Sequence, residues 1–191
     1  MLKQSYDKLA IQYDNMYSEP SDLEEDKELF GLLREHLTGK VLDIGAGTGL
    51  LLDNIDIPIE DYFGIDPSAE MLVVLDKKHP ERKIMATDFE GFVGLMDDFD
   101  TVVALYGVAS YIRQDYLEKV KETLSENGKF FLMFYKPNYY PRFYGDEEKA
   151  ELDANSNYAH IHRTFDHVYD WSHYVIATNF VIEEWEASKF K

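Results

Sequence analysis

Three glycines at alternate positions follow an apolar segment in the stretch KVLDIGAGTGLLLDN. Alternate glycines destabilise a strand, so Gly45, Gly47 and Gly49 predict a loop whose backbone must come close to a ligand. A turn from strand to helix offers unpaired N–H groups for this purpose. The dinucleotide-binding pattern requires a further glycine where Leu50 stands. Asp43, just before the loop, would lie poorly beside a pyrophosphate and better beside a cationic group.

Two further acidic residues, Asp66 and Asp88, stand at the ends of the next two apolar segments. Asp66 follows the loop by about twenty residues, where a carboxylate can accept from both hydroxyls of a ribose. Asp88 ends the segment KIMATD, where it can accept from an adenine amino group while the Phe89 N–H meets a ring nitrogen. Each acid alone is typical of a helix cap or a solvated loop. Together, behind one glycine loop, Asp43, Asp66 and Asp88 favour a nucleoside site.

The elements that must position these residues alternate along the chain. Short apolar segments predict strands at 40–45, 62–66, 83–88, 100–107 and 129–135. Helix-like segments lie at 48–54, 68–78, 90–97 and 113–124. An earlier amphipathic helix is expected after Ser21, which can form a capping box with Glu24. The alternation predicts an α/β fold: a Rossmann-like, doubly wound, mostly parallel sheet with helices on both faces.

The alternation of strand-like and helix-like segments ends at about Lys136. Turn-forming residues and many tyrosines without a clear period predict an irregular excursion from the sheet. After it we expect a helix, a helix stop at Asn179 and a terminal strand that begins near Phe180.

The ordered segments VLDIGAGTG, FGIDPSAEML, ATDFE, FDTVVALYGVASYI and LSENGKFFLMFY resemble the successive motifs of class I S-adenosylmethionine-dependent methyltransferases. The likeness covers roughly residues 1–135, and the tail is similar to the family's final helix and strand. It implies one domain over 1–191 with a seven-stranded sheet whose terminal strand is antiparallel. Within that domain it implies an N-terminal helical segment at 1–38 and a substrate lid at 136–162.

The resemblance implies S-adenosylmethionine as cofactor and small-molecule methylation as activity. Asp43 would then lie near the methionine amino group, Asp66 would hold the ribose, and Asp88 with Phe89 would contact the adenine. Met71 and Leu105 could equally be ordinary core residues. The cofactor-binding residues that the resemblance implies are Tyr13, Asp43, Gly45, Ala46, Gly47, Asp66, Pro67, Met71, Asp88, Phe89, Leu105 and Tyr106.

Transfer of a methyl group from a sulfonium is an in-line displacement that depends on positioning, and no motif dictates a general base. His160 and His162 are the candidates for that base, and no metal site is expected because the pair lacks a third ligand. Aromatic side chains could pack the excursion onto the sheet or face a cationic or aromatic substrate. The candidate substrate residues are Tyr6, Tyr111, Tyr139, Tyr140, Phe143, Tyr144 and Tyr158.

Composition limits the classes of partner that we expect for this protein. The net charge of −18 disfavours nucleic acid, whose phosphates are bound by Lys and Arg. No apolar run is long enough to span a membrane and no signal peptide is seen, so we expect a cytoplasmic protein, either a monomer or a homodimer. Transfer to oxygen or nitrogen of a small molecule is the leading hypothesis. The alternatives are a cofactor-binding regulator or scaffold without methyl transfer, and a protein methyltransferase.

Overall fold

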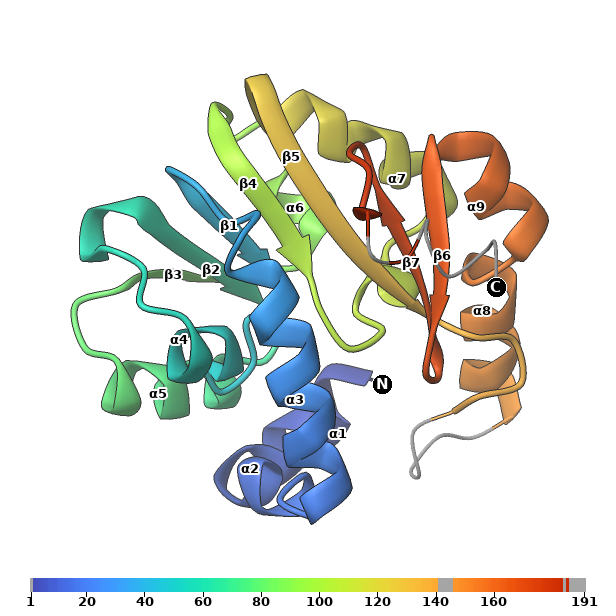
Figure 1. The fold of residues 1–191 in the computed structure, drawn as a ribbon. Coiled ribbons are helices and arrows are strands. Elements are labelled where there is room, and N and C mark those ends of the chain that lie inside the picture. The colour runs from blue at the N-terminus through green and yellow to red at the C-terminus, as the bar shows by residue number, and fades with distance from the viewer. Residues whose placement is uncertain (1, 141–145, 184, 186–191) are drawn as a thin grey trace.

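The computed structural model describes residues 2–140, 146–183 and 185 (Figure 1). Within them, one sheet has seven strands in the order β3-β2-β1-β4-β5-β7-β6. The strands are β1 (Val41–Ile44), β2 (Tyr62–Asp66), β3 (Lys83–Ala86), β4 (Phe99–Ala104), β5 (Leu124–Tyr135), β6 (His167–Trp171) and β7 (Tyr174–Thr178). The first five are parallel, and β7 runs antiparallel to both β5 and β6. The predicted fold class is confirmed.

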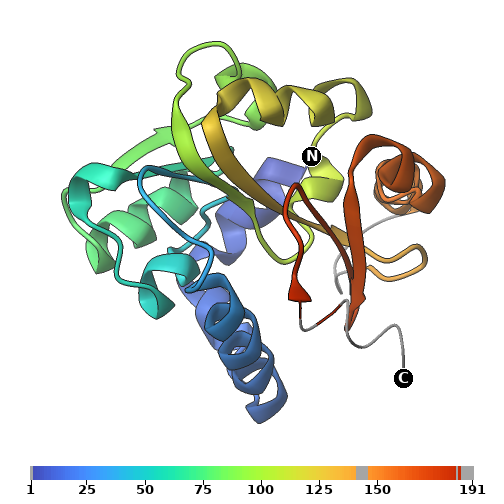
Figure 2. The same ribbon diagram turned by 45° about the horizontal axis from the view of Figure 1, so that its top comes forward.

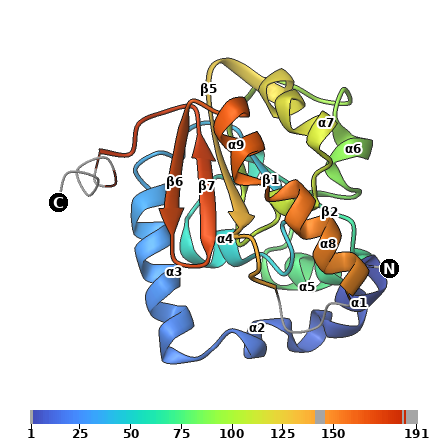
Figure 3. The same cartoon turned by 90° about the vertical axis from the view of Figure 1, so that its right-hand side faces the viewer.

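Helices cover both faces of this sheet. The α-helices are α1 (Leu2–Leu9), α2 (Tyr13–Met16), α3 (Pro20–Leu33), α4 (Leu50–Asn54), α5 (Ala69–Lys78), α6 (Phe89–Phe92), α7 (Gln114–Leu117), α8 (Asp146–Asn155) and α9 (Tyr158–Thr164). Short 3-10 helices are η1 (Ala10–Gln12), η2 (Ile59–Asp61), η3 (Ala109–Tyr111) and η4 (Glu118–Thr123). One buried cluster joins α3, α4 and α5 to the sheet, and a second joins α6, α7 and α9 to the opposite face (Figure 3).

The N-terminal helices gather where the parallel strands end. Figures 1 and 2 show α1 and α2 beside this edge and the long helix α3 extending away from the sheet. Helix α3 begins with a capping box formed by Glu19 and Asp22, whose carboxylate accepts from the Glu19 N–H at 3.2 Å. The predicted box of Ser21 and Glu24 is wrong, because Pro20 already occupies the first helical turn.

The prediction for the C-terminal part is also wrong. A helix was expected before Asn179, but β6 and β7 form a hairpin there, with Ser172 at a positive φ of 48° in the turn. All five residues of β7 are buried, so this aromatic and β-branched segment completes the sheet. Asn179 ends no helix: its side chain bonds the Phe130 N–H and the Gly128 carbonyl.

The excursion between β5 and β6 is more regular than predicted. It carries α8 and α9, and Leu152 and Ile161 from these helices are buried in the two clusters. One buried apolar side chain among the described residues of each helix gives too weak a period to be recognised in the sequence. No helix among the described residues is long and apolar enough to cross a bilayer.

Candidate active site

The glycine loop follows β1 and is tied to β2. The N–H groups of Gly45 and Ala46 both donate to the Ile65 carbonyl, at 2.8 and 2.9 Å. The Gly47 N–H donates to Asp66 Oδ2 at 2.9 Å. Gly45 and Gly47 have φ angles of 72° and 55°, which residues with a Cβ atom rarely adopt. The loop therefore holds a shape that bare backbone permits, at the carboxyl end of the parallel strands.

Asp66 ends β2 and fixes this loop. Its Oδ1 accepts from the Ser68 N–H at 2.7 Å, so each carboxylate oxygen holds one backbone N–H. Burial raises the pKa of Asp66 to about 6, although the two backbone hydrogen bonds partly oppose the shift. A carboxylate has further lone pairs on each oxygen, so Asp66 can still accept from two hydroxyl groups.

Asp43 lies beneath the loop and is 3% exposed. The Tyr62 hydroxyl donates to its Oδ2 at 2.9 Å. Burial raises the pKa of Asp43 to about 7, against the lowering effect of the Tyr62 hydrogen bond. Neither Asp43 nor Asp66 forms an ion pair with a Lys or Arg of the described chain. Two buried carboxylates without a cation beside an open glycine loop fit a positively charged, hydroxyl-bearing ligand.

The raised pKa of Asp43 makes stability depend on pH. Between pH 4 and pH 7 the unfolded chain loses this proton while the folded chain keeps it, so stability should fall as pH rises. The loss is at most about 1.4 kcal/mol per pH unit from one group. We expect the melting temperature of the ligand-free protein to fall over this interval, and less steeply in Asp43→Asn. The exposed Asp56→Asn serves as control, and an unchanged slope in Asp43→Asn would contradict the assignment.

The N-terminal helices cover the loop through side chains that sequence reasoning missed. The Ser68 hydroxyl donates to Asp7 at 2.6 Å, and the Thr48 hydroxyl donates to Asp14 at 2.5 Å. Tyr13 is half-buried nearby. Its pKa is raised mainly by burial, then by the neighbouring Tyr6 and Tyr17, whose ring centroids lie 6.1 and 5.1 Å away, and least by the Asp66 carboxylate. The hydrogen bonds of Asp7 and Asp14 join segments far apart in sequence, so no local pattern could have indicated them.

The residues predicted to surround the adenine differ in how far their side chains are exposed. Asp88 is exposed and caps α6 by accepting from the Gly91 N–H at 2.9 Å. Phe89 and Met71 are each 2% exposed, so their side chains belong to the packed core. Pro67 is exposed beside Asp66. Their backbones remain at the same edge as the glycine loop, because β3 pairs in parallel with β2.

Leu105 and Tyr106 follow β4, next to β1 in the sheet. Leu105 is buried, and Tyr106 has a positive φ of 49°. The Tyr106 hydroxyl donates a short hydrogen bond to Asp26 of α3. Its ring meets that of Tyr174 edge-on with centroids 5.8 Å apart. The sequence does not indicate Asp26 or Tyr174 as partners of Tyr106, because α3 and β7 are far from this loop along the chain.

The candidate substrate residues divide between two regions. The Tyr6 and Tyr111 hydroxyls lie 3.3 Å apart, which brings α1 to η3. Tyr139 stacks on His173, with ring centroids 4.4 Å apart, and Tyr140 donates to Asp153 of α8. Tyr158 instead donates to Asp170 on the edge strand β6. The other two candidates, Phe143 and Tyr144, lie outside the described residues.

The two histidine candidates are not brought to the loop by any contact within the described part of the chain. The His160 Nε2 lies 3.4 Å from the Thr164 hydroxyl, within α9. The His162 ring stacks on Tyr158, with centroids 6.3 Å apart. No group of three possible metal ligands occurs among the residues described.

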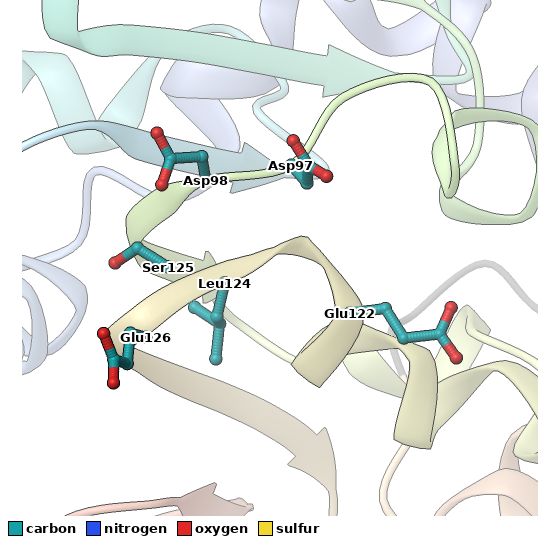
Figure 4. A pocket seen from close by; sticks show the side chains of 6 residues that line it. All are labelled: Asp97, Asp98, Glu122, Leu124, Ser125 and Glu126. Carbon is teal, nitrogen blue, oxygen red and sulfur yellow. The ribbon is translucent and has the colours of Figure 1, made fainter.

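A separate hollow of about 450 Å³ lies at the other edge of the sheet (Figure 4). Its lining includes Asp97 and Asp98, before β4, together with Leu124 and Glu126 at the start of β5. Parallel strands begin there and end at the glycine loop. The hollow therefore belongs to the edge opposite the candidate site.

Comparisons with known proteins agree with this geometry. Residues 42–130 match the family model described as a methyltransferase domain. An uncharacterized methyltransferase of Bacillus cereus is 32% identical over 97 residues, which make up 50% of this chain and 42% of that protein. The chain spans less than half of the length of the curated relatives that it matches.

Solved structures share the fold at low identity. The DhpI–SAH complex aligns with a TM-score of 0.66 and 15% identity, over 92% of this chain and 93% of that one. The sugar N-methyltransferase KedS8 from a Streptoalloteichus species aligns with a TM-score of 0.52 and 22% identity, over 69% of this chain and 57% of that one. Residues 42–130 are thus similar to a methyltransferase domain, and the chain has the fold of solved S-adenosylmethionine-dependent methyltransferases.

Proposed function

We propose that this protein transfers the methyl group of S-adenosylmethionine to an oxygen or nitrogen atom of a small molecule. The observation that carries the proposal is the loop at Gly47, whose N–H is held by Asp66 above the buried Asp43. The two carboxylates suit the hydroxyls and the amino group of a cationic nucleoside. The cofactor would supply an activated methyl group on a sulfonium.

The chain's own residues would bind and orient the reactants. The backbone of Gly45, Ala46 and Gly47 would lie against the methionine part, with Asp43 near its amino group and Asp66 on the ribose. Asp88, Phe89, Pro67 and Met71 would surround the adenine, and Leu105, Tyr106 and Tyr13 would close the remaining sides. Much of the rate enhancement in such a displacement can come from holding the reacting atoms in line.

The phenols near the site would act as hydrogen-bonding groups and not as bases. Burial, together with Asp26, raises the pKa of Tyr106 well above its ordinary value. Burial likewise raises the pKa of Tyr13 and of Tyr174. All three therefore stay protonated at neutral pH. No general base is assigned: a neutral amine could attack with its lone pair and lose its proton to water afterwards, whereas a hydroxyl acceptor would need a base to take its proton.

We also propose that residues 136–162 form the lid over the acceptor. The Asn155 side chain donates to the Ser110 carbonyl at 2.8 Å, and the Ser110 and Ser156 hydroxyls lie 2.7 Å apart. These contacts fasten the C-terminal end of α8 to η3, just beyond Tyr106. The single domain over 1–191 would then have its N-terminal helices on one side of the site and this segment on another.

A labelling experiment tests the proposed activity. The purified protein is incubated with methyl-labelled S-adenosylmethionine and a metabolite extract, and the products are separated by size. We expect label in small molecules together with an equal amount of S-adenosylhomocysteine. Label that appears only in proteins, or the absence of turnover despite cofactor binding, would contradict the proposal.

A further inference from the structure

A group of aromatic side chains extends from Tyr106, and its other members lie outside the proposed cofactor site. Tyr174 lies at its centre, with ring centroids 5.8 Å from those of Tyr106 and Tyr135 and 6.0 Å from that of Trp171. The Tyr139 ring is 6.3 Å away. We call these five residues the aromatic cluster. They come from the ends of β4, β5 and the β6–β7 hairpin, on the side of the sheet that α3 covers.

The Tyr174 hydroxyl is exceptional within this cluster. The residue is only 7% exposed, yet its hydroxyl makes no hydrogen bond with any residue that the structure describes. Buried phenol groups normally find a partner. No fully enclosed polar side-chain atom of the described residues lacks one, so the Tyr174 oxygen must face an opening. An accessible hydroxyl on a buried ring is suited to a ligand.

The charges around the cluster are negative. Helix α3 contributes Glu28, whose Oε1 accepts from the Trp171 indole N–H at 3.0 Å, and Asp26, which accepts from Tyr106. Glu25 directly precedes Asp26, lies about one helical turn before Glu28 on neighbouring positions of the α3 surface, and is half-buried. After burial, carboxylates and neighbouring phenols have the largest effects on the pKa of Tyr106 and Tyr174, and Glu25 acts on both. Glu25 is thus on the segment of α3 whose neighbours Asp26 and Glu28 contact the cluster directly.

The nearby lysine does not neutralise these carboxylates. Lys136 follows β5, but its ammonium donates to the Ser172 carbonyl at 2.9 Å and lies 3.8 Å from Asp170. It is therefore directed to the hairpin turn. Glu25, Asp26 and Glu28 form no ion pair with any residue that the structure describes. Aromatic faces beside such carboxylates can bind ammonium groups, at about 0.5 to 2 kcal/mol for each cation–π contact.

We infer that the methyl acceptor carries a positively charged amine, which the aromatic cluster binds together with Glu25 and the Tyr174 hydroxyl. The inference rests on the proposed function and specifies its substrate class. The charged amine is distinct from the atom that receives the methyl group, because a protonated amine has no lone pair. The net charge of −18 would also favour a cation approaching from solution.

The test uses two probes of opposite charge that share a phenol ring, tyramine and 4-hydroxyphenylacetate. The protein is first saturated with S-adenosylhomocysteine, and each probe is then titrated while the tryptophan fluorescence, which includes that of Trp171, is followed. We expect tyramine to bind at least about tenfold more tightly. Equal affinities, tighter binding of the acid, or binding of neither probe would overturn the inference.

Two matched variants on α3 test which carboxylate binds the amine of tyramine. Glu25→Gln should weaken tyramine binding by about fivefold to tenfold, whereas Glu24→Gln on the exposed side of the helix should leave it unchanged. Tyr174→Phe should also weaken it, with little loss of stability because the removed hydroxyl has no hydrogen-bond partner among the described residues. Equal effects of Glu25→Gln and Glu24→Gln would contradict the inference, as would weaker binding of S-adenosylhomocysteine alone in Glu25→Gln. Failure of the wild type to bind S-adenosylhomocysteine would instead contradict the proposed function.

Discussion

Asp66→Asn is expected to lower the affinity for S-adenosylhomocysteine by about 10- to 100-fold. One carboxylate oxygen becomes an NH₂ group, which cannot accept from the Gly47 or Ser68 N–H and cannot accept from a ribose hydroxyl. Hydrogen bonds to a charged group contribute about 1.5 to 3 kcal/mol each, which gives this range. Calorimetric titration of the variant and the wild type at one pH measures the difference.

Glu70→Gln is the matched control for Asp66→Asn. Glu70 is an exposed residue in the first turn of α5, close in sequence to Asp66 and remote from its hydrogen bonds. Its substitution should leave the affinity within about twofold of the wild type, because an exposed charge contributes little. Equal affinities for Asp66→Asn and Glu70→Gln would show that Asp66 does not hold the ligand.

Alanine at Gly45 and at Gly47 should separate packing from ligand binding. A Cβ on Gly45 would lie 2.6 Å from a methyl group of Val108, and the residue has a positive φ. Strain and overpacking together should lower the free energy of unfolding by about 3 kcal/mol. A Cβ on Gly47 would meet nothing closer than the Gly45 carbonyl at 3.9 Å, so only about 1 to 2 kcal/mol should be lost there.

For the affinity for S-adenosylhomocysteine we expect the opposite order, with the larger loss in Gly47→Ala. In Gly47→Ala the new methyl group would occupy the open side of the loop, where the methionine part of the cofactor is proposed to lie. We expect this variant to remain folded by thermal melting and to lose most of its affinity for S-adenosylhomocysteine. A folded Gly47→Ala with wild-type affinity would place the ligand elsewhere.

The parallel half of the fold could be predicted because its signals are local. Strand β2 was predicted with its observed bounds, and the loop of Gly45 and Gly47 was placed correctly at the end of β1. In each case the segment is buried on both faces, which gives a short apolar run between turn residues. Asp43 and Asp66 could be recognised because they lie next to that loop along the chain.

The C-terminal hairpin and the α3 side of the site could not be predicted in this way. Residues 166–178 mix aromatic and polar residues, and the two-residue turn has no glycine or asparagine to mark it. The contacts from Asp26 to Tyr106 and from Glu28 to Trp171 join residues that are 80 and 143 positions apart. Such pairs are set by tertiary packing, to which local periodicity is insensitive.

Calorimetric titration of the wild-type protein with S-adenosylhomocysteine tests the central claim most directly. The claim is that the glycine loop, with Asp43 and Asp66, forms a site for this nucleoside. We predict saturable binding of one ligand per chain, together with a rise in melting temperature as the ligand stabilises the folded state. The absence of both heat and thermal stabilisation at millimolar ligand would contradict the account.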